Sequence, residues 1–526
     1  MSHPQVRTLD KSSAPRVMFA GDRLVLADMP EGTRVIYPKP PLEGLPDVDA
    51  AIRYAINHPH GSEPLYAKLK PGMKVVIAID DLSMPLPPMR APDVRERVLT
   101  VVLEQLADHG IDDVTMIIAT AFHRRMKGSE IRHIVGDKIF NAYYPDRLFN
   151  HDAEDPKGMK YVGTTEAGEE VELNKRAVES DLLIYVNLNF VPMNGGHKSV
   201  AVGLSGYRSL KYHHRPQTLR EPGSYMDPEV SGLSKSFQRM GRLTNKALNV
   251  FTIETTINNR MFDAPLAWLS KPEDDHTPWE RTAMKTLIAT LDRLPQGMRQ
   301  KIFEQVPAPY EVTGIFAGET EAAHAHTLAK SAEQYIVPIR GQADVLVTGI
   351  PFVSPYSVNA FLNPLLVQVM ASGYLFNLHK GDPLVKKGGT MIITHPCTDK
   401  FDEEQHTAYV EFVHGVLPET RDAMTMHKKY EAQFAKNPAY IQAYRTGHAY
   451  HPAHPFYMWY WGEPGRQHLG RTIVVGADNE YIPKLLGWET AKTMQEALEM
   501  AKGIHGPSMT TTMMHTAPML MADCRA

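Results

Sequence analysis

The sequence has little cysteine, no surplus of charge of one sign and no long apolar run, and each absence excludes a class of protein. Cys397 and Cys524 are the only cysteines among 526 residues, too few for a disulfide framework or a structural zinc site. The formal net charge of −4 gives no long-range attraction to nucleic acid or acidic membranes. No stretch approaches the roughly 18 apolar residues of a membrane span, and no signal-peptide pattern opens the chain. We expect a cytoplasmic protein that binds neither nucleic acid nor membrane.

The length of the chain exceeds what one hydrophobic core usually organises, so we expect two α/β domains with mostly parallel sheets and a ligand site in the cleft between them. Buried-strand and helix patterns alternate, which is typical of parallel sheets. Strands are expected at 74–80, 114–120, 181–187, 344–350, 389–394 and 471–476, and helices at 93–109, 319–334, 402–415 and 490–502. The predicted domains are 1–335, which holds the strand ends expected to carry functional groups, and 336–526, which closes the cleft. Residues 210–300 have weak periodicity and predict irregular structure with short helices.

Polar residues follow the first two predicted strands, at the sheet edge where α/β folds place functional groups. Asp81 and Ser83 come after the first strand, where they could orient a sugar hydroxyl or phosphate, or merely cap a turn. His123 follows the second strand, and a neutral imidazole is a natural general base near neutral pH. Structural histidines are commoner than catalytic ones, so His123 alone is weak evidence.

A Gly-Gly-His-Lys motif follows the third predicted strand. Gly195 and Gly196 would let the backbone approach a ligand closely, and the amine of Lys198 could meet a phosphate or act as a nucleophile. A tight turn with a solvated lysine is the simpler interpretation, because the spacing is not that of a P-loop. His213 and His214 could ligate nickel, copper or zinc, but adjacent side chains point apart, so at most one is expected to reach a given metal.

The order and spacing of these motifs resemble the lactate racemase family, whose members bind a nickel-pincer nucleotide. In chain order the motifs are Asp81-Leu82-Ser83-Met84-Pro85, Phe122-His123-Arg124, Asn150-His151-Asp152, Gly163-Thr164-Thr165 and Gly195-Gly196-His197-Lys198. His214 lies sixteen positions after Lys198, at the spacing of the family's nickel ligand. Each motif is weak alone, but five in the same order are not expected by chance.

The resemblance implies an isomerase, a racemase or epimerase of a 2-hydroxy acid or sugar acid. Such an enzyme works by proton abstraction and hydride transfer to and from nickel pyridinium-3,5-bisthiocarboxylic acid mononucleotide, through a 2-keto intermediate. The implied partners are a small hydroxy-acid substrate and the proteins that make the cofactor. The resemblance implies that His123 is the catalytic base and His214 the nickel ligand. It implies that Lys198 is a catalytic residue and holds the cofactor, either covalently or not. The implied neighbours of the cofactor are Asp81, Ser83, Gly195 and Gly196.

Two departures from the family pattern indicate that lactate is not the substrate. Met84 occupies the place of an arginine that grips the substrate carboxylate, and a thioether cannot form that clamp. Lactate should therefore bind poorly unless Arg90, Arg124 or Arg125 reaches the site. Leu188 occupies the place of a second histidine base, and leucine cannot transfer protons. Symmetrical catalysis by two bases is therefore in doubt.

The residues that contact substrate in the family are also replaced further along the chain. Phe352, Val353 and Asn359 lie where a lysine and a glutamine would be expected. These replacements indicate a larger or less acidic substrate. The residues expected near that substrate are Arg124, Met84, Asn189 and Asn359.

Three other functions stay open. A nicotinamide-dependent dehydrogenase would need a GxGxxG motif after a strand, which the sequence lacks. A non-catalytic protein that binds or delivers the nickel-pincer nucleotide would keep Lys198 and His214 and lose substrate contacts, although it has little need of His123. A Schiff-base enzyme would need Lys198 desolvated. The sequence assigns neither the substrate's identity nor an oligomeric state.

Overall fold

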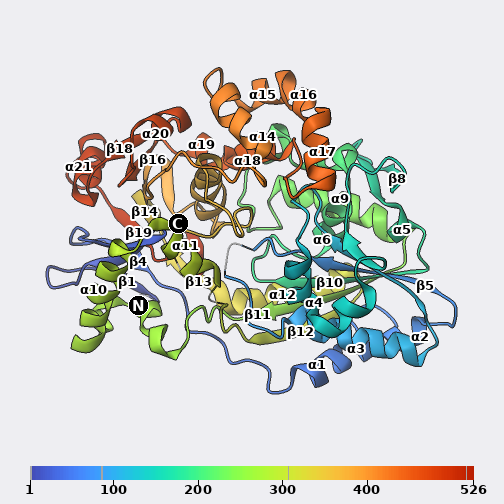
Figure 1. Ribbon diagram of the computed structural model, residues 1–526. Coiled ribbons are helices and arrows are strands. Elements are labelled where there is room, and N and C mark those ends of the chain that lie inside the picture. Colours follow the sequence, from blue (N-terminus) through green and yellow to red (C-terminus); the bar gives the residue numbers. More distant parts are fainter. Residues whose placement is uncertain (1–2, 85–86, 306, 517) are drawn as a thin grey trace.

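The computed structural model describes residues 3–84, 87–305, 307–516 and 518–526, and its core consists of two large, mostly parallel sheets with helices around them (Figure 1). The predicted α/β class is confirmed. The first sheet has the strand order β12-β11-β10-β5-β6-β7. Its strands are β5 (Lys74–Asp80), β6 (Asp113–Ala119), β7 (Leu148–Asn150), β10 (Leu182–Asn189), β11 (Val250–Ile257) and β12 (Val312–Gly318), of which β12 is antiparallel to its neighbour.

The first sheet is parallel because both of its faces are covered by helices. Val75, Ile77 and Ile79 of β5 share one core cluster with α3 (Val94–Asp108). Val76 and Ala78 share another with α6 (His197–Gly203) and α9 (Gly232–Ala247). Helix α3 begins at Asp93, whose side chain accepts a hydrogen bond from the amide of Arg95, as expected of an N-cap. The strands expected at 74–80, 114–120 and 181–187 and the helix expected at 93–109 are therefore confirmed within two residues.

The second large sheet joins strands from both ends of the chain. Its order is β1-β4-β19-β14-β16-β17-β18, with β2 beside β14 and β3 beside β2, and the blue N-terminal strands lie beside β14 and β19 in Figure 1. Its strands are β1 (Val6–Thr8), β2 (Arg16–Gly21), β3 (Arg23–Ala27), β4 (Arg34–Ile36), β14 (Ala343–Pro351), β16 (Val385–Thr394), β17 (Arg471–Val475), β18 (Glu489–Ala491) and β19 (Thr511–Met514). The division at residue 335 stays a prediction; it did not anticipate that the first strands join the later sheet.

The remaining elements cover these sheets or extend them. Two small sheets contain β13 (Ile336–Arg340), β20 (Met521–Arg525) and β15 (His379–Gly381), and β8 (Met159–Thr164) with β9 (Glu170–Asn174). The other helices before residue 336, apart from two in the middle region described below, are α1 (Val48–Asn57), α2 (Leu65–Lys68), α4 (Gly128–Tyr143), α5 (Lys175–Val178), α7 (Tyr207–His213), α8 (Pro216–Leu219) and α12 (Thr320–Tyr335). Later helices are α13 (Pro364–Gln368), α14 (Thr407–Glu411), α15 (Ala423–Lys429), α16 (Glu431–Ala435), α17 (Pro438–Thr446), α18 (His454–Trp461), α19 (Glu463–His468), α20 (Tyr481–Leu486) and α21 (Met494–His505), with π-helical turns η3 (Val369–Leu375) and η4 (Phe412–Val416).

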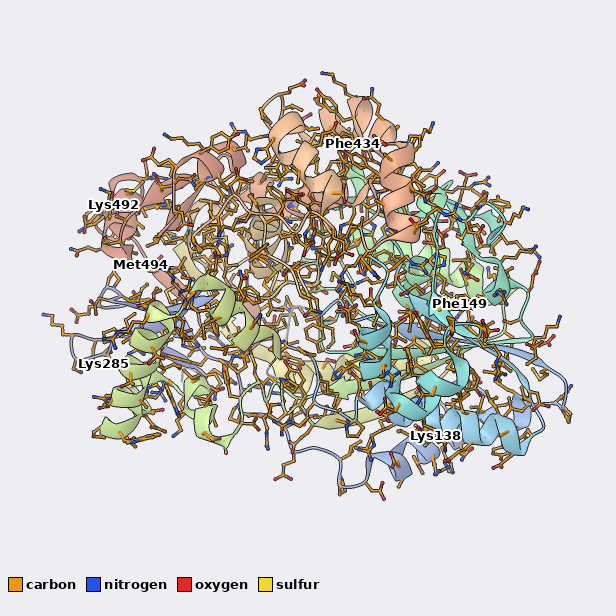
Figure 2. The ribbon with its side chains drawn as sticks, in the orientation of Figure 1. Lys138, Phe149, Lys285, Phe434, Lys492 and Met494 are labelled. Carbon is orange, nitrogen blue, oxygen red and sulfur yellow. The ribbon has the colours of Figure 1, made fainter. Side chains whose placement is uncertain are left out.

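The later strands and helices were also largely predicted. The strands expected at 344–350, 389–394 and 471–476 are present as β14, β16 and β17. The helix expected at 319–334 is α12, whereas those expected at 402–415 and 490–502 begin later than predicted, as α14 with η4 and as α21. Charged side chains such as Lys138, Lys285 and Lys492 lie on the outside of the molecule (Figure 2). Within the described ranges, no helix has the length and apolar character needed to cross a bilayer.

The expectation of irregular structure over 210–300 is wrong. This region contains α9, β11, α10 (Pro278–Arg293) and α11 (Gln296–Gln305), besides short 3-10 turns η1 (Ala264–Ser270) and η2 (Glu273–Asp275). Strand β11 escaped detection because its buried positions include Glu254 and three threonines, which interrupt the apolar run. The buried face of α9 includes Ser234, Ser236 and Thr244, so this face is only partly apolar in sequence.

A buried ion pair joins the first residues of the chain to this middle region. Arg16 in β2 lies 3.3 Å from Glu273 in η2, and both side chains are at most 1% exposed. Glu273 also accepts hydrogen bonds from the amide of Val17 (2.7 Å) and the hydroxyl of Tyr37 (2.8 Å), and it lies 2.9 Å from His515. Burial opposes the charge of Glu273, but His515 and Arg16 outweigh it and lower its pKa to about 2.

Replacing Glu273 with glutamine should lower the free energy of unfolding by about 3 kcal/mol, because one partner of a buried pair is lost. The difference in free energy of unfolding between wild type and variant should have its full value above pH 4.5, the usual pKa of a glutamate. It should shrink as the pH falls toward about 2, the pKa of Glu273 in the folded protein. Urea unfolding between pH 3 and pH 7 measures it. Glu179→Gln removes the exposed partner of Lys160 and should cost less than about 1 kcal/mol; equal costs would contradict the assignment.

Candidate active site at the edge of the first sheet

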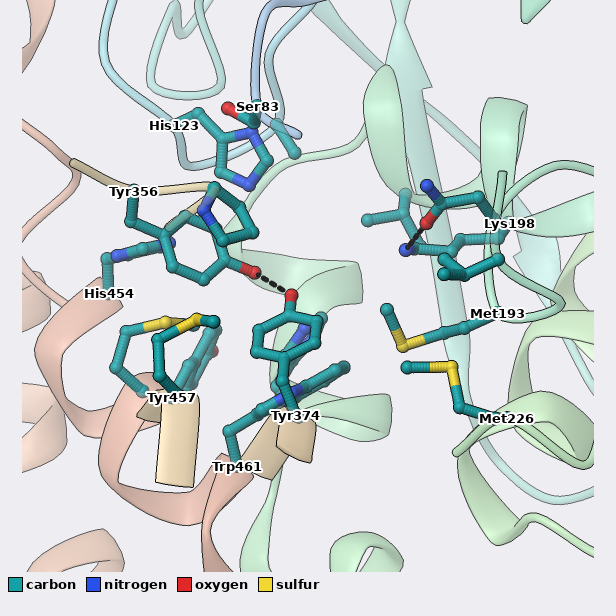
Figure 3. A pocket seen from close by; sticks show the side chains of 18 of the residues that line it. Ser83, His123, Met193, Lys198, Met226, Tyr356, Tyr374, His454, Tyr457 and Trp461 are labelled. Carbon is teal, nitrogen blue, oxygen red and sulfur yellow. Dashed lines mark hydrogen bonds between the residues drawn. The ribbon is translucent and has the colours of Figure 1, made fainter. Parts of the chain in front are cut away.

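Two adjoining cavities in the described part of the chain lie at the carboxyl ends of β5, β6 and β10. The larger, of about 1120 Å³ including open space, we call the apolar chamber, and the smaller, of about 590 Å³, the polar chamber. The residues that line both are Ser83, Ala121, His123, Asn194, Lys198 and Val202. Residues predicted at three separate strand ends therefore line these two adjoining cavities, part of which is shown in Figure 3.

The two chambers differ in character. The polar chamber is further lined by Asp80, Asp81, Met84, Arg95, Ala119, Tyr185, Asn187, Leu188, Gly195, Ser199 and Gly203. The apolar chamber is further lined by Phe122, Val191, Met193, Leu210, His214, Met226, Pro351, Pro355, Tyr356, Met370, Tyr374, Leu375, Leu378, His454, Tyr457, Met458, Trp461, Thr516 and Met519. Helix α18 and the π-helical turn η3 supply much of the wall of the apolar chamber.

His123 is oriented by Asp81. Its Nδ1 lies 2.7 Å from Asp81 Oδ2, and Asp81 accepts hydrogen bonds from the amide (2.9 Å) and hydroxyl (3.1 Å) of Ser83. Burial opposes the charge of Asp81, but His123 and these hydrogen bonds outweigh it and lower its pKa. An ionised carboxylate on Nδ1 keeps the proton there and leaves Nε2 to act as a base. Asp81 and Ser83, predicted as cofactor neighbours, thus also position the predicted base. Pro85, in the same motif, lies outside the described residues.

Lys198 lies at the junction of the two chambers, near the start of α6. Its Nζ donates a hydrogen bond to Asn194 Oδ1 at 3.1 Å, as drawn in Figure 3. Burial lowers the pKa of Lys198 to about 8, against the opposing effect of the carboxylates of Asp80 and Asp81. A larger fraction of this amine is therefore neutral near physiological pH than for a solvated lysine, and only the neutral amine is nucleophilic.

The turn before Lys198 requires its two glycines. Gly195 and Gly196 have φ values of 80° and 57°, and a Cβ on Gly196 would lie 2.7 Å from His324. Glu254, buried in β11, accepts a hydrogen bond from the amide of Gly196 at 2.6 Å and lies 2.9 Å from Nδ1 of His324. Glu254 and His324 therefore hold the turn that positions Lys198. The sequence analysis missed Glu254; an acidic residue within a strand-like run was the available signal.

Of the two adjacent histidines, His214 lines the apolar chamber and His213 lies fully buried behind it. Their Nδ1 atoms are 2.6 Å apart, so one ring donates to the other. The His214 ring stacks on Tyr457 and Trp461, and in the described residues its Nε2 has no hydrogen-bond partner. Burial, with the charges of His213, Lys198 and His123, lowers the pKa of His214 well below its usual value. Its imidazole is therefore neutral, as metal ligation requires.

Of the four residues expected near substrate, only Met84 lines one of the two chambers. Met84 lines the polar chamber. Arg124 forms two hydrogen bonds of 2.9 and 2.7 Å with Glu130, which also accepts one from Asn359. Asn189 donates to the carbonyl of Asn194 and accepts from a serine of α12. Arg124, Asn189 and Asn359 are not among the described residues that line the two chambers.

The other arginines near the site are also occupied. Arg90 forms an exposed ion pair with Asp263. Arg95 lines the polar chamber, but its guanidinium binds both carboxylate oxygens of Asp93 and two backbone carbonyls at the end of β5. Leu188 also lines the polar chamber. In the described ranges, no arginine with an unoccupied guanidinium lines either chamber, so the carboxylate clamp expected of the family has no replacement.

His454 is a site residue that the sequence analysis did not single out. It begins α18 and lines the apolar chamber, where its ring meets that of His123 edge to face at a centroid distance of 5.7 Å. The hydroxyl of Tyr409 lies 2.6 Å from its Nδ1, and its buried Nε2 has no partner among the described residues. Burial and the neighbouring histidines lower the pKa of His454 well below its usual value. The aromatic and histidine-rich run 450–461 was the available signal.

Known proteins resemble the chain in sequence and in structure. Residues 21–227 match the family model of the lactate racemase N-terminal domain. Lactate racemases from Thermoanaerobacterium thermosaccharolyticum and Lactiplantibacillus plantarum are 24% and 25% identical over 180 and 177 residues, and each match covers 32% of this chain and 39% of the relative. These sequence matches therefore span less than half of each curated relative.

The structural resemblance extends over nearly the whole chain. The lactate racemase apoprotein of Thermoanaerobacterium thermosaccharolyticum matches with a TM-score of 0.62 and 18% identity, covering 98% of this chain and 100% of that one. A protein from Thermotoga maritima matches with a TM-score of 0.52 and 14% identity, covering 92% and 100%. The structural matches establish a shared fold. The matched N-terminal domain and the two curated relatives show that the first part of the chain is similar in sequence to lactate racemases.

Proposed function

We propose that this protein is a nickel-pincer nucleotide-dependent racemase or epimerase of a hydroxy acid other than lactate. Similarity to lactate racemases supports an isomerase. The observation that supports the finer proposal is the placement of His123, Lys198 and His214 around one cavity, the apolar chamber. A base, a nucleophilic amine and a metal-ligating imidazole are the groups that this chemistry needs.

The residues present fit the nickel-pincer nucleotide. In the described part of the chain, no group of three or more His, Cys, Asp or Glu side chains could hold a metal alone, so a metal bound at His214 needs donors from elsewhere. A pincer ligand supplies such donors. Lys198 would hold its arm, His214 Nε2 would ligate nickel, and the polar chamber, with Gly195 and Ser199, would take polar groups of the nucleotide. When bound, the cofactor supplies the hydride acceptor and donor that protein side chains lack.

The protein's own residues would manage the proton. His123 Nε2 would remove the hydroxyl proton of the substrate, and Asp81 would stabilise the resulting imidazolium at Nδ1. His454 would stay neutral beside it, because burial disfavours its charged form. The apolar chamber would keep water from the reacting carbon.

The leucine at position 188 does not prevent inversion. The proton moves at the oxygen, which is not the stereocentre, so one base can remove it and return it. The configuration depends only on which face of the planar carbonyl receives the hydride. His123 and His454 are in contact and so lie on one side of the space, which favours acid–base chemistry from that side over a symmetrical pair of bases.

Purified from cells that also make the cofactor, the protein should contain one nickel ion and one nucleotide per chain. His214→Ala should lose most of the nickel, because the single protein donor is removed, and Lys198→Ala should lose any covalent adduct. Native and denaturing mass spectrometry with nickel analysis measures both. His326→Ala is the control, because His326 is absent from the lining of both chambers and should not affect loading. Wild-type protein without nickel or nucleotide, despite proven cofactor supply, would refute the proposal.

His123→Asn should lower the isomerisation rate of the loaded protein by roughly 10²- to 10⁴-fold, the usual contribution of a general base. Asp81→Asn should lower it by about 10²-fold or more, because an amide does not fix the Nδ1–H tautomer. Ser83→Ala should lower it less than about tenfold, since Asp81 keeps the backbone hydrogen bond. Chiral chromatography over a panel of hydroxy acids, normalised to nickel content, measures all three. Full loading of the wild type with no turnover of any hydroxy acid would instead favour a carrier of the nucleotide.

A further inference from the structure

The wall of the apolar chamber is almost free of charge. Among its described lining residues there is no aspartate, glutamate or arginine, and Lys198, at the junction, is the one lysine. Five methionines and a set of aromatic rings form most of the surface, and Met193 and Met226 face Tyr374 and Trp461 across the space in Figure 3. Hydroxyls of Tyr356 and Tyr374 bond to each other at 2.9 Å. The polar atoms of Tyr457, Trp461 and His454 that are buried without a partner among the described residues are uncharged.

We propose that the chamber takes a 2-hydroxy acid whose substituent at the carbinol carbon is bulky, uncharged and apolar, such as an aromatic ring or a branched aliphatic chain. This assignment rests on the proposed function, because His123 defines where the substrate hydroxyl lies. His123 lines both chambers, so the carbinol carbon lies at their junction. Lys198 would hold the cofactor, so Ser83 and Asn194 are the polar residues of that junction available to a carboxylate.

The substituent then extends into the apolar chamber. A methyl group, as in lactate, would leave most of this space without contacts, whereas a ring would bury its faces against methionine and aromatic side chains. Methionine adapts its shape to such groups. A second carboxylate, as in malate, would lose its hydration and meet no arginine among the described lining residues. The chamber therefore favours apolar substituents over charged ones.

The replacements at the family's substrate positions lie outside the lining of the apolar chamber, but they also remove charged or polar groups. Met84, Phe352 and Val353 stand where charged or amide side chains were expected, and Arg124 is bound to Glu130. An alternative use of the apolar wall is to cover only the flat ring of the cofactor, since His214 stacks on Tyr457 and Trp461. In that case the size of the substrate's substituent would not affect binding.

Calorimetric titration of 3-phenyllactate, lactate and malate, against protein purified with and without the cofactor, tests the assignment. Burying a phenyl ring should make 3-phenyllactate bind at least about tenfold more tightly than lactate, and malate should bind no more tightly than lactate. Met226→Gln puts a polar amide of similar size into the wall and should lower the ratio of 3-phenyllactate to lactate affinity severalfold. Met494→Gln makes the same change at a buried methionine of α21 that does not line the chamber, and should leave the ratio unchanged.

The outcomes separate this assignment from the proposed function. Lactate or malate binding as tightly as 3-phenyllactate, or turning over faster in loaded protein, would overturn the assignment while leaving the isomerase proposal intact. The assignment would also be overturned if Met226→Gln and Met494→Gln had the same ratio of 3-phenyllactate to lactate affinity. Preferential binding of 3-phenyllactate without any turnover in loaded protein would support the chamber's selectivity and refute the isomerase. If the protein never takes up nickel, the isomerase proposal fails and the affinity ratio of the cofactor-free protein decides the assignment.

Discussion

The candidate site depends on the close spacing of three parallel strands. β5 lies between β10 and β6, so the loops that follow these strands leave the sheet side by side at one edge. This adjacency brings Asp81 to 2.7 Å from His123, although they are more than forty residues apart in the chain. It also places Lys198 at the same junction. A parallel sheet buried on both faces fixes strand register firmly, and the positions of the base and the amine are fixed with it.

Buried polar groups carry this precision from the sheet to the side chains. Glu254 accepts from the amide of Gly196 and contacts His324, which ties the glycine turn to the neighbouring strand β11. Asp80 is held in the same way by Tyr185, Asn187 and the amide of Leu188. An unsatisfied buried carboxylate is costly, so each of these bonds disfavours other arrangements of its loop. The proposed base thus lies on a loop and Lys198 at the start of a helix, and both are anchored to buried strands.

The sequence predicted three of the six strands of the first sheet, β5, β6 and β10, because apolar runs ending in polar residues are a local signal. Motif order and spacing selected His123, Lys198 and His214, which line one cavity, and their roles stay predictions. β11 was not predicted, since Glu254 and its threonines interrupt the apolar run and are stabilised by tertiary hydrogen bonds that no window of sequence contains. The N-terminal strands join the second large sheet because β2 pairs with β14 and β4 with β19. These are likewise long-range pairings without a local sequence pattern. Part of the wall of the apolar chamber comes from α18 and η3, which lie more than 150 residues beyond His214 in the chain. His454 and Trp461 could therefore not be assigned to the site from the sequence.

This separation along the chain explains how the family's chemistry and its substrate recognition can diverge independently. The residues proposed to move the proton and to hold the cofactor come from the loops after β5, β6 and β10 and from α6 and α7. The residues proposed to face the substrate's substituent include Met193 and Met226 and also members of η3, α18 and the C-terminal segment. Replacements in these last three elements would leave the Asp81–His123 pair and the Lys198 turn intact, since neither forms a hydrogen bond to them. On the proposed function, a change of substrate therefore needs no change in the base, and the presence of His123 in a chain without the carboxylate clamp favours altered specificity over loss of catalysis.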